Sequence, residues 1–216
     1  MKPEQIPRVF VDLYRATKVG EIVSPPTLPE PPYPEWENDV VTGGGFEPAR
    51  NGRVRRVRTL PDTIGARMRL LIVGLNPSEY AADAGVGFAR PGNRFWPAAL
   101  EAGIVTRDRD PLHALTAHRI GMTDLVKRAT PRADALASDE YRSGMARIAR
   151  IGAWLRPKAI CFVGLAGYRV AVDRRATAGW QEDAVGACHT YVMPNPSGLN
   201  AHVRVSDLAA HLRAFE

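Results

Sequence analysis

Short apolar runs alternate with longer amphipathic stretches along residues 68–216. The runs at 69–74 and 159–164 end in glycine and the run at 190–193 precedes a proline, which is typical of buried parallel strands. A weaker run at 119–122 predicts a fourth strand. Apolar residues recur at helical spacing in 139–155, with Ser138 as the expected N-cap, and further helices are expected at 95–103, after Leu165 and at 203–215.

This alternation determines the predicted fold class. Strands that alternate with helices imply right-handed crossovers between parallel strands. The sequence therefore predicts an α/β protein, with a short, mostly parallel central sheet that helices cover on both faces.

Residues 1–60 differ from the rest, and we expect them to form an N-terminal extension to a domain at 61–216. Six prolines lie between Pro25 and Pro34 and three glycines follow at 43–45, so extended or irregular chain is expected there, after a short helix near 8–17. Residues 50–58 hold five arginines. This run is either a solvated surface arm or an arm that contacts phosphates, and the sequence leaves both interpretations open.

Composition and charge narrow the class of protein. The 216 residues carry a net charge of +6, which is compatible with a polyanionic partner without requiring one. The chain has no apolar run of membrane-spanning length and no apolar stretch near its N-terminus, so we expect a cytoplasmic protein without a membrane partner. Cys161 and Cys188 are the only cysteines and the five histidines show no metal-type pairing, so no metal or other cofactor is expected.

Three loops that follow predicted strands carry the candidate chemistry. They span residues 74–96, 121–128 and 193–200, and in a parallel sheet such loops meet at the edge where ligands bind. The sequence contains no phosphate-binding loop, no dinucleotide fingerprint after the first strand and no G-x-S-x-G elbow of a serine hydrolase.

The content of these loops resembles one family. A Gly-Leu-Asn-Pro turn at 74–77, the segment Phe-Ala-Arg-Pro-Gly-Asn-Arg-Phe-Trp at 88–96 and an Asn-Pro-Ser-Gly-Leu loop at 195–199 follow one another in the same order. Residues 68–215 thereby resemble the mismatch-specific uracil/thymine DNA glycosylases, within the uracil-DNA glycosylase superfamily. The resemblance implies a three-layer α/β/α fold and an enzyme that rotates a base out of the duplex and hydrolyses its N-glycosidic bond.

Two residues are the expected catalytic groups. The resemblance makes Asn76 the catalytic asparagine, whose amide orients a water towards C1′ of the sugar but cannot remove a proton at neutral pH. Asp124 departs from the best-known bacterial member, which has a lysine at this position. We expect the Asp124 carboxylate to accept a proton from the water or to stabilise the sugar cation. The alternatives are a simple turn at Asn76 and a helix cap at Asp124.

The expected base pocket is formed by the first loop. Phe88 is the candidate platform on which the rotated pyrimidine stacks, and the backbone amides near Leu75 and Phe88 would read the edge of the base. Tyr80 and Ala81 are expected near the 5-substituent of the pyrimidine. The alternative for Phe88 is an ordinary core residue.

The expected DNA contacts lie mainly on the third loop. Leu199 is the candidate wedge between base pairs, and its neighbours Gly198 and Asn200 would contact the base opposite. The alternative is a leucine folded back into the protein. Asn93 is a candidate cap for the helix at 95–103. The candidate phosphate contacts are Arg94, Lys127 and Ser197.

These expectations define a function. The sequence predicts a monomeric, monofunctional glycosylase that removes uracil from mismatched double-stranded DNA, with thymine and ethenocytosine as further candidate bases. Lys127 is the only lysine in the three loops, so no Schiff-base lyase step is expected. The alternatives are a damage-binding module without catalysis and an enzyme acting on free nucleosides.

Overall fold

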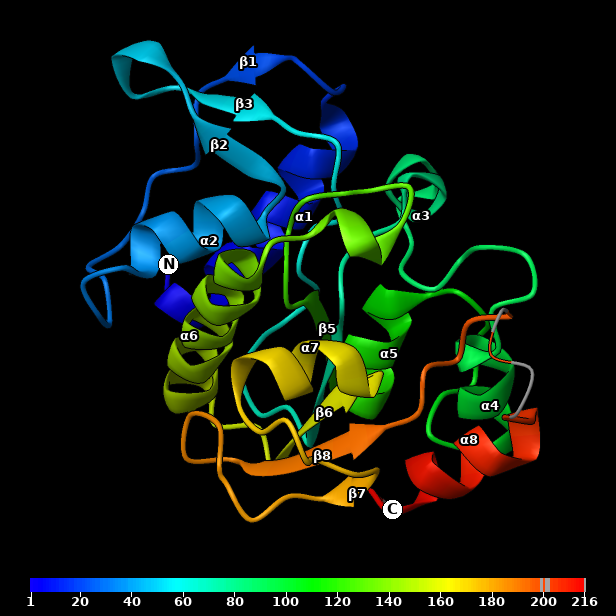
Figure 1. Cartoon of the computed structure of the whole chain (residues 1–216). Helices are drawn as coiled ribbons and strands as arrows, with labels where there is room; N and C mark the ends of the chain where they lie inside the picture. The colour runs from blue at the N-terminus through cyan, green and yellow to red at the C-terminus, as the bar shows by residue number, and fades with distance from the viewer. Residues whose placement is uncertain (199, 201–202, 216) are drawn as a thin grey trace.

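A five-stranded sheet lies at the centre of the computed structural model, which describes residues 1–198, 200 and 203–215 (Figure 1). The strand order is β5-β4-β6-β8-β7; the first four strands in this order pair in parallel, and the edge strand β7 is antiparallel. The strands are β4 Leu70–Gly74, β5 Ile120–Asp124, β6 Ala159–Val163, β7 Gly179–Trp180 and β8 His189–Met193.

Helices cover both faces of this sheet because successive side chains of a strand point to opposite sides. Leu70 and Ile72 of β4 pack against α4 and α8, whereas Leu71 and Val73 pack against α6 and α7. The three-layer α/β/α prediction is therefore confirmed. The helices of this part are α3 Glu79–Ala84, α4 Phe95–Glu101, α5 Pro111–His118, α6 Ser138–Leu155, α7 Leu165–Ala171 and α8 Val205–Arg213, with a 3₁₀ turn at Ala133–Ala135.

The four predicted strands and all five predicted helices are present, including the one near 8–17, with boundaries shifted by a few residues. The cap predicted at Ser138 is wrong by one position, because α6 begins at Ser138 and the Glu140 carboxylate accepts the N–H of Ala137 at 2.9 Å. The helices α3 and α5 were not predicted. Six residues are too few for a periodic pattern in α3, and α5 is marked mainly by its cap, Asp110, which accepts the N–H of His113.

The N-terminal segment, residues 1–57, is folded rather than irregular. Its helices α1 and α2 and a small antiparallel sheet enclose a separate apolar core that includes Phe10, Trp36 and Phe46. Trp36 also meets Trp154 of α6 edge-on, with ring centroids 5.9 Å apart. The extended or irregular chain expected over the prolines and glycines is found over 24–35, which contain no helix or strand, whereas Gly43 ends α2 and Gly44 and Gly45 form a turn. The elements are α1 Ile6–Ala16, α2 Trp36–Gly43, β1 Ile22–Val23, β2 Phe46–Pro48 and β3 Val54–Arg56, with 3₁₀ turns at Pro3–Gln5 and Arg50–Gly52.

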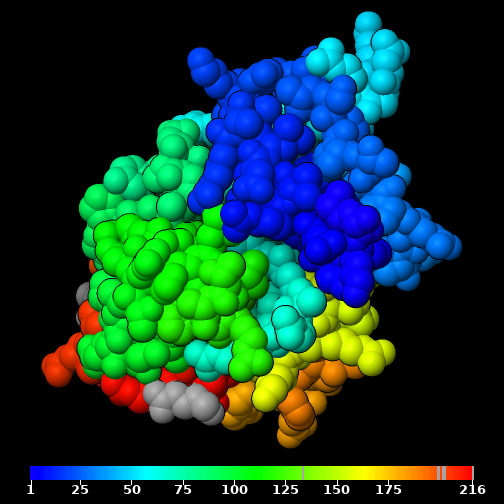
Figure 2. Space-filling view, turned by 180° about the vertical axis from the view of Figure 1, so that it is seen from behind, coloured from blue at the N-terminus to red at the C-terminus, as the bar shows by residue number. Residues whose placement is uncertain are grey.

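The arginine run belongs to this segment and is not a free arm. The Arg56 guanidinium lies 3.2 Å from the centre of the Tyr14 ring, Arg55 pairs with Glu47, and Arg58 pairs with Glu79 and Asp83 of α3. From behind, the blue N-terminal segment covers the upper part of the molecule and borders the green residues near 110 (Figure 2). Within the described ranges, no helix is long and apolar enough to cross a membrane.

Candidate active site

A cleft of about 260 Å³ opens at the carboxyl edge of the parallel sheet. Asn76 and Phe88 of the first loop, Asp124 at the end of β5 and Asn195 and Ser197 of the third loop all line it. The structure thus brings together parts of the three loops singled out in the sequence. Leu199, the predicted wedge, lies outside the described residues.

Asn76 is anchored by one end of its side chain. Its Nδ2 donates to Thr130 Oγ1 at 2.7 Å, to the Arg128 carbonyl at 3.1 Å and to the Pro77 carbonyl at 3.2 Å. All three partners are acceptors here, so they fix which end of the amide carries the nitrogen. The amide oxygen has no hydrogen bond to any described residue, and it is the atom left to accept a bond from a water in the cleft.

Asp124 is a buried carboxylate without a hydrogen-bond partner among the residues that the structure describes. It is 8% exposed, and it lies opposite Gly74 in the register of β4 and β5. A Cβ atom at position 74 would lie 2.5 Å from Asp124 Oδ1, so glycine there makes room for the carboxylate. Burial raises the pKa of Asp124 to about 6, while Lys127 and Arg147 oppose the rise and Asp62 adds to it. A carboxyl with this pKa is mostly ionised at neutral pH and can take up a proton.

Phe88 is fixed as a flat wall of the cleft. Its ring stacks on Phe95 with centroids 4.2 Å apart and planes 23° apart. Its backbone has φ 59°, in the left-handed region, which costs a non-glycine residue about 1–2 kcal/mol. The adjacent Gly87 carbonyl accepts the indole N–H of Trp96 at 2.8 Å. The helix α4 therefore holds Phe88 in a strained conformation beside the cleft.

Of the remaining predicted pocket residues, two line the cleft and one does not. Leu75 and Ala81 line the cleft, and Ser78 caps α3 by accepting the Ala81 N–H at 3.1 Å. Tyr80 does not line the cleft and is 51% exposed, since α3 turns it towards solvent while Ala81 faces inward. The prediction that Tyr80 meets the 5-substituent of the base does not fit this geometry.

The Arg94 guanidinium binds backbone carbonyls of the protein and is not free to contact a phosphate. Its guanidinium donates to the carbonyls of Ser197 and Asn200, each at 2.6 Å, and to that of Val203. The third loop is thereby tied to the start of α4, and its turn at Gly198 packs closely against the Gly92 carbonyl. The cap predicted at Asn93 is wrong by one position, because Arg94 is the N-cap of α4; Asn93 Oδ1 still accepts the Phe95 N–H at 2.9 Å.

Two other candidate phosphate contacts also have internal partners. Lys127 has a side chain only 8% exposed, and its Nζ lies 2.8 Å from Asp62 Oδ1, so its ammonium is not available to DNA. Ser197 lines the cleft, and its N–H donates to Asn195 Oδ1 at 3.0 Å. Asn200 Nδ2 donates back to the Asn195 carbonyl at 3.1 Å, which closes the loop on itself.

Comparisons with known proteins give the family of the chain. A family model described as the uracil DNA glycosylase superfamily matches residues 61–215. The chain belongs to this superfamily. A solution NMR structure of a protein from Methanosarcina acetivorans, proposed to be a uracil DNA glycosylase, superposes with a TM-score of 0.51 at 23% identity, covering 73% of this chain and 97% of that one. This structural similarity supports the fold. Membership of the superfamily indicates DNA glycosylase activity in general.

The structure shows contacts at the site that the sequence did not predict. Thr130 holds the amide of Asn76, and Asn195 orders the third loop. Thr130 stands in no motif, and it lies 54 residues from Asn76, so only the fold reveals this contact. Asn195 belongs to the Asn-Pro-Ser-Gly-Leu loop, which indicated chemistry without indicating this bond. Within the described residues no group of three or more His, Cys, Asp or Glu side chains could hold a metal ion.

Proposed function

We propose that this protein is a monofunctional DNA glycosylase that removes uracil from mismatched double-stranded DNA, with thymine and ethenocytosine as further candidate bases. The observation that carries the proposal is the pairing of Asn76, with its amide oxygen unengaged by described residues, and the buried Asp124 carboxylate in one cleft. The protein would act as a monomer on DNA in the cytoplasm.

In this proposal a rotated base stacks on Phe88, and the backbone N–H groups near Leu75 and Phe88 face its edge. Neither of these two N–H groups donates to a backbone carbonyl among the described residues. A base-edge oxygen or nitrogen would supply the missing acceptors. Leu199, with Gly198 and Asn200, would fill the space that the base leaves.

The reaction follows from the two polar groups. Water bound to the Asn76 oxygen attacks C1′ as the bond from C1′ to the base breaks, and the electron pair leaves with the base. The Asp124 carboxylate takes the proton that the water loses. No lysine lines the cleft in the described part of the chain, so the product would be an intact abasic strand rather than a Schiff base.

Strand scission at abasic sites tests the proposal. The purified protein is incubated with labelled duplexes that carry uracil, thymine or ethenocytosine opposite each of the four bases, and the product is then treated with alkali. We expect cleavage of the U:G duplex only after alkali, and loss of cleavage in a double Asn76→Ala, Asp124→Asn variant. The Tyr80→Phe variant, changed outside the cleft, should match the wild type.

The same assay distinguishes catalysis from binding. Retention of a damaged duplex in a gel shift, without alkali-labile sites on any substrate, would identify a binding module instead. Activity on free nucleosides that is insensitive to salt would point to a nucleoside hydrolase, because contact with several phosphates makes DNA binding strongly salt-dependent.

A further inference from the structure

A buried ion cluster includes residues close to Asp124 in the chain. The Asp62 carboxylate accepts from Lys127 Nζ at 2.8 Å and from Thr123 Oγ1 at 2.6 Å, and it also pairs with the guanidinium of Arg147. The side chains of Asp62, Lys127 and Arg147 are each 8% exposed or less. Thr123 and Lys127 flank Asp124 in the chain, so the cluster fixes the backbone on both sides of it.

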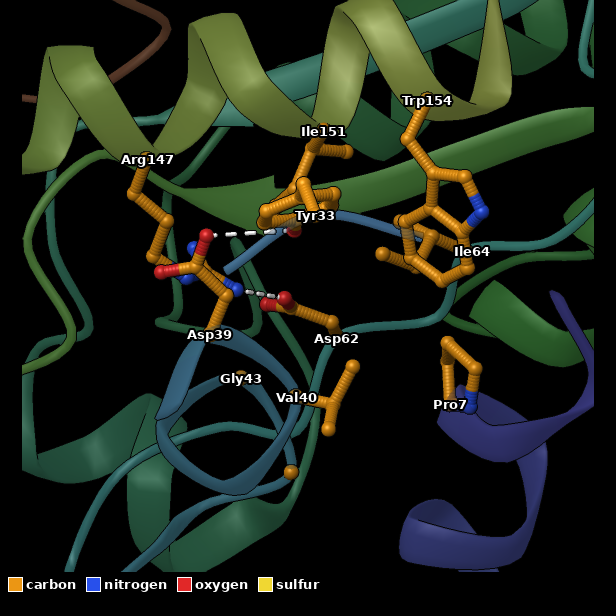
Figure 3. A pocket seen from close by; sticks show the side chains of 11 residues that line it. Pro7, Tyr33, Asp39, Val40, Gly43, Asp62, Ile64, Arg147, Ile151 and Trp154 are labelled. Carbon is orange, nitrogen blue, oxygen red and sulfur yellow. Dashed lines mark hydrogen bonds and ion pairs between the residues drawn. The ribbon is translucent and has the colours of Figure 1, made fainter. Parts of the chain in front are cut away.

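The N-terminal segment closes this cluster from outside. The Gly43 carbonyl at the end of α2 accepts the Asp62 N–H at 2.7 Å, and a Cβ atom at Gly43 would collide with Asp62 and Arg147. Beside it, Asp39 of α2 receives two bonds of 2.8 Å from Arg150 of α6 and one of 3.1 Å from Tyr33. Figure 3 shows Tyr33, Asp39, Asp62 and Arg147. They line a cavity of only about 10 Å³, too small for more than one water.

The charges of the cluster do not balance without Asp124. Lys127 and Arg147 contribute two positive charges and Asp62 one negative charge, so the three groups carry a net +1. Asp124, which lacks a hydrogen-bond partner among the described residues, supplies the fourth charge. These same three side chains are the charged groups that act on it. Because all four residues are buried, the attraction is stronger than it would be at the surface.

We propose that the N-terminal segment and the cluster of Asp62, Lys127 and Arg147 position Asp124 and set its ionisation. The catalytic part of this inference rests on the proposed function, in which the Asp124 carboxylate accepts a proton. Asp62 and Lys127 are then positioning residues, and the N-terminal segment serves the active site by keeping the cluster dry.

Two substitutions that change the cluster charge in opposite directions test this inference. Lys127→Met removes a positive charge and should raise the pKa of Asp124, whereas Asp62→Asn removes a negative charge and should lower it, each by about one unit. In the wild type, the single-turnover rate should rise with pH along a limb whose midpoint lies near pH 6. When each rate is divided by its own plateau value, Lys127→Met lowers the rate at pH 6 about fivefold relative to the wild type. Asp62→Asn raises the normalised rate at pH 5 about fivefold.

Two control variants separate the effect of the cluster charge on the pH profile from the effect of a disrupted structure. Asp83→Asn breaks an ion pair on the surface and should leave the profile unchanged. Arg147→Lys keeps the cluster charge and should leave the limb in place, so it replaces Asp62→Asn as the partner of Lys127→Met if Asp62→Asn does not fold. Shifts of Lys127→Met and Asp62→Asn in the same direction, or no shift in either, overturn the inference. With Arg147→Lys as the partner, an unmoved limb in Lys127→Met or an equal shift in both variants overturns it.

A measurement without catalysis keeps this inference separate from the proposed function. Carbon-13 NMR of the carboxyl groups, assigned with Asp124→Asn, follows the ionisation of Asp124 directly. Opposite displacements of its titration in the two variants support the electrostatic role even if no duplex is cleaved. An unmoved titration overturns it even if the enzyme is active.

Discussion

Replacing Asp124 by asparagine should stabilise the protein while removing its activity. The pKa of this carboxyl rises from an ordinary 3.8 to about 6, chiefly because it is buried. Each unit of such a shift corresponds to about 1.4 kcal/mol, so the ionised group destabilises the folded state by about 3 kcal/mol above pH 6. The group is 8% exposed, and solvent screening therefore does little to reduce this figure.

The pH dependence gives the direction of the effect. The folded state binds the proton more tightly than the unfolded chain, so the contribution of Asp124 to stability is fully present below pH 3.8 and is lost as the pH rises through 6. Asparagine has no such dependence. At pH 8 the variant should therefore exceed the wild type by about 3 kcal/mol, or roughly 6–12 °C in Tm. Near pH 3.5 the two should differ little.

Urea denaturation followed by tryptophan fluorescence at pH 8 and pH 3.5 measures both differences. Asp62→Asn is the matched control, since it makes the same chemical change nearby. Burial opposes ionisation there, but Arg147 and Lys127 hold the pKa of Asp62 below its usual range, so this variant should be destabilised at pH 8. An Asp124→Asn variant no more stable than the wild type at pH 8 would refute the claim that burial disfavours the ionised carboxylate.

Three further substitutions test individual contacts. Thr130→Val removes the hydroxyl that orients Asn76, and it should lower the single-turnover rate about 10- to 100-fold with little change in duplex affinity by fluorescence anisotropy. Phe88→Ala removes the stacking surface and should weaken binding to a uracil duplex by about 1–3 kcal/mol in the same assay; unaltered binding would remove Phe88 from the pocket. Arg94→Lys replaces the planar guanidinium, whose two terminal nitrogens reach three carbonyls, with a compact ammonium, so limited proteolysis should cut the third loop faster than in the wild type.

The sequence alone determined the layered architecture and the place of the site. Short apolar runs that alternate with helical stretches favour parallel strands between helices, and β4, β5, β6 and β8 lie at those runs. Because parallel strands bring their carboxyl ends to one edge, the loop positions of Asn76, Phe88 and Asp124 were enough to predict a shared cleft.

Only the tertiary structure decided what each side chain does there. Arg94 and Lys127 have the charge expected of phosphate contacts, yet their partners are carbonyls over 100 residues away and a buried carboxylate 65 residues away. A charge in sequence does not reveal whether the folded chain brings an acceptor to it. The N-terminal segment shows the same limit, since its prolines and glycines indicated irregular chain, while Trp36 and Phe46 found an apolar core against α1. Such long-range contacts depend on which surfaces meet on folding, and no local pattern records them.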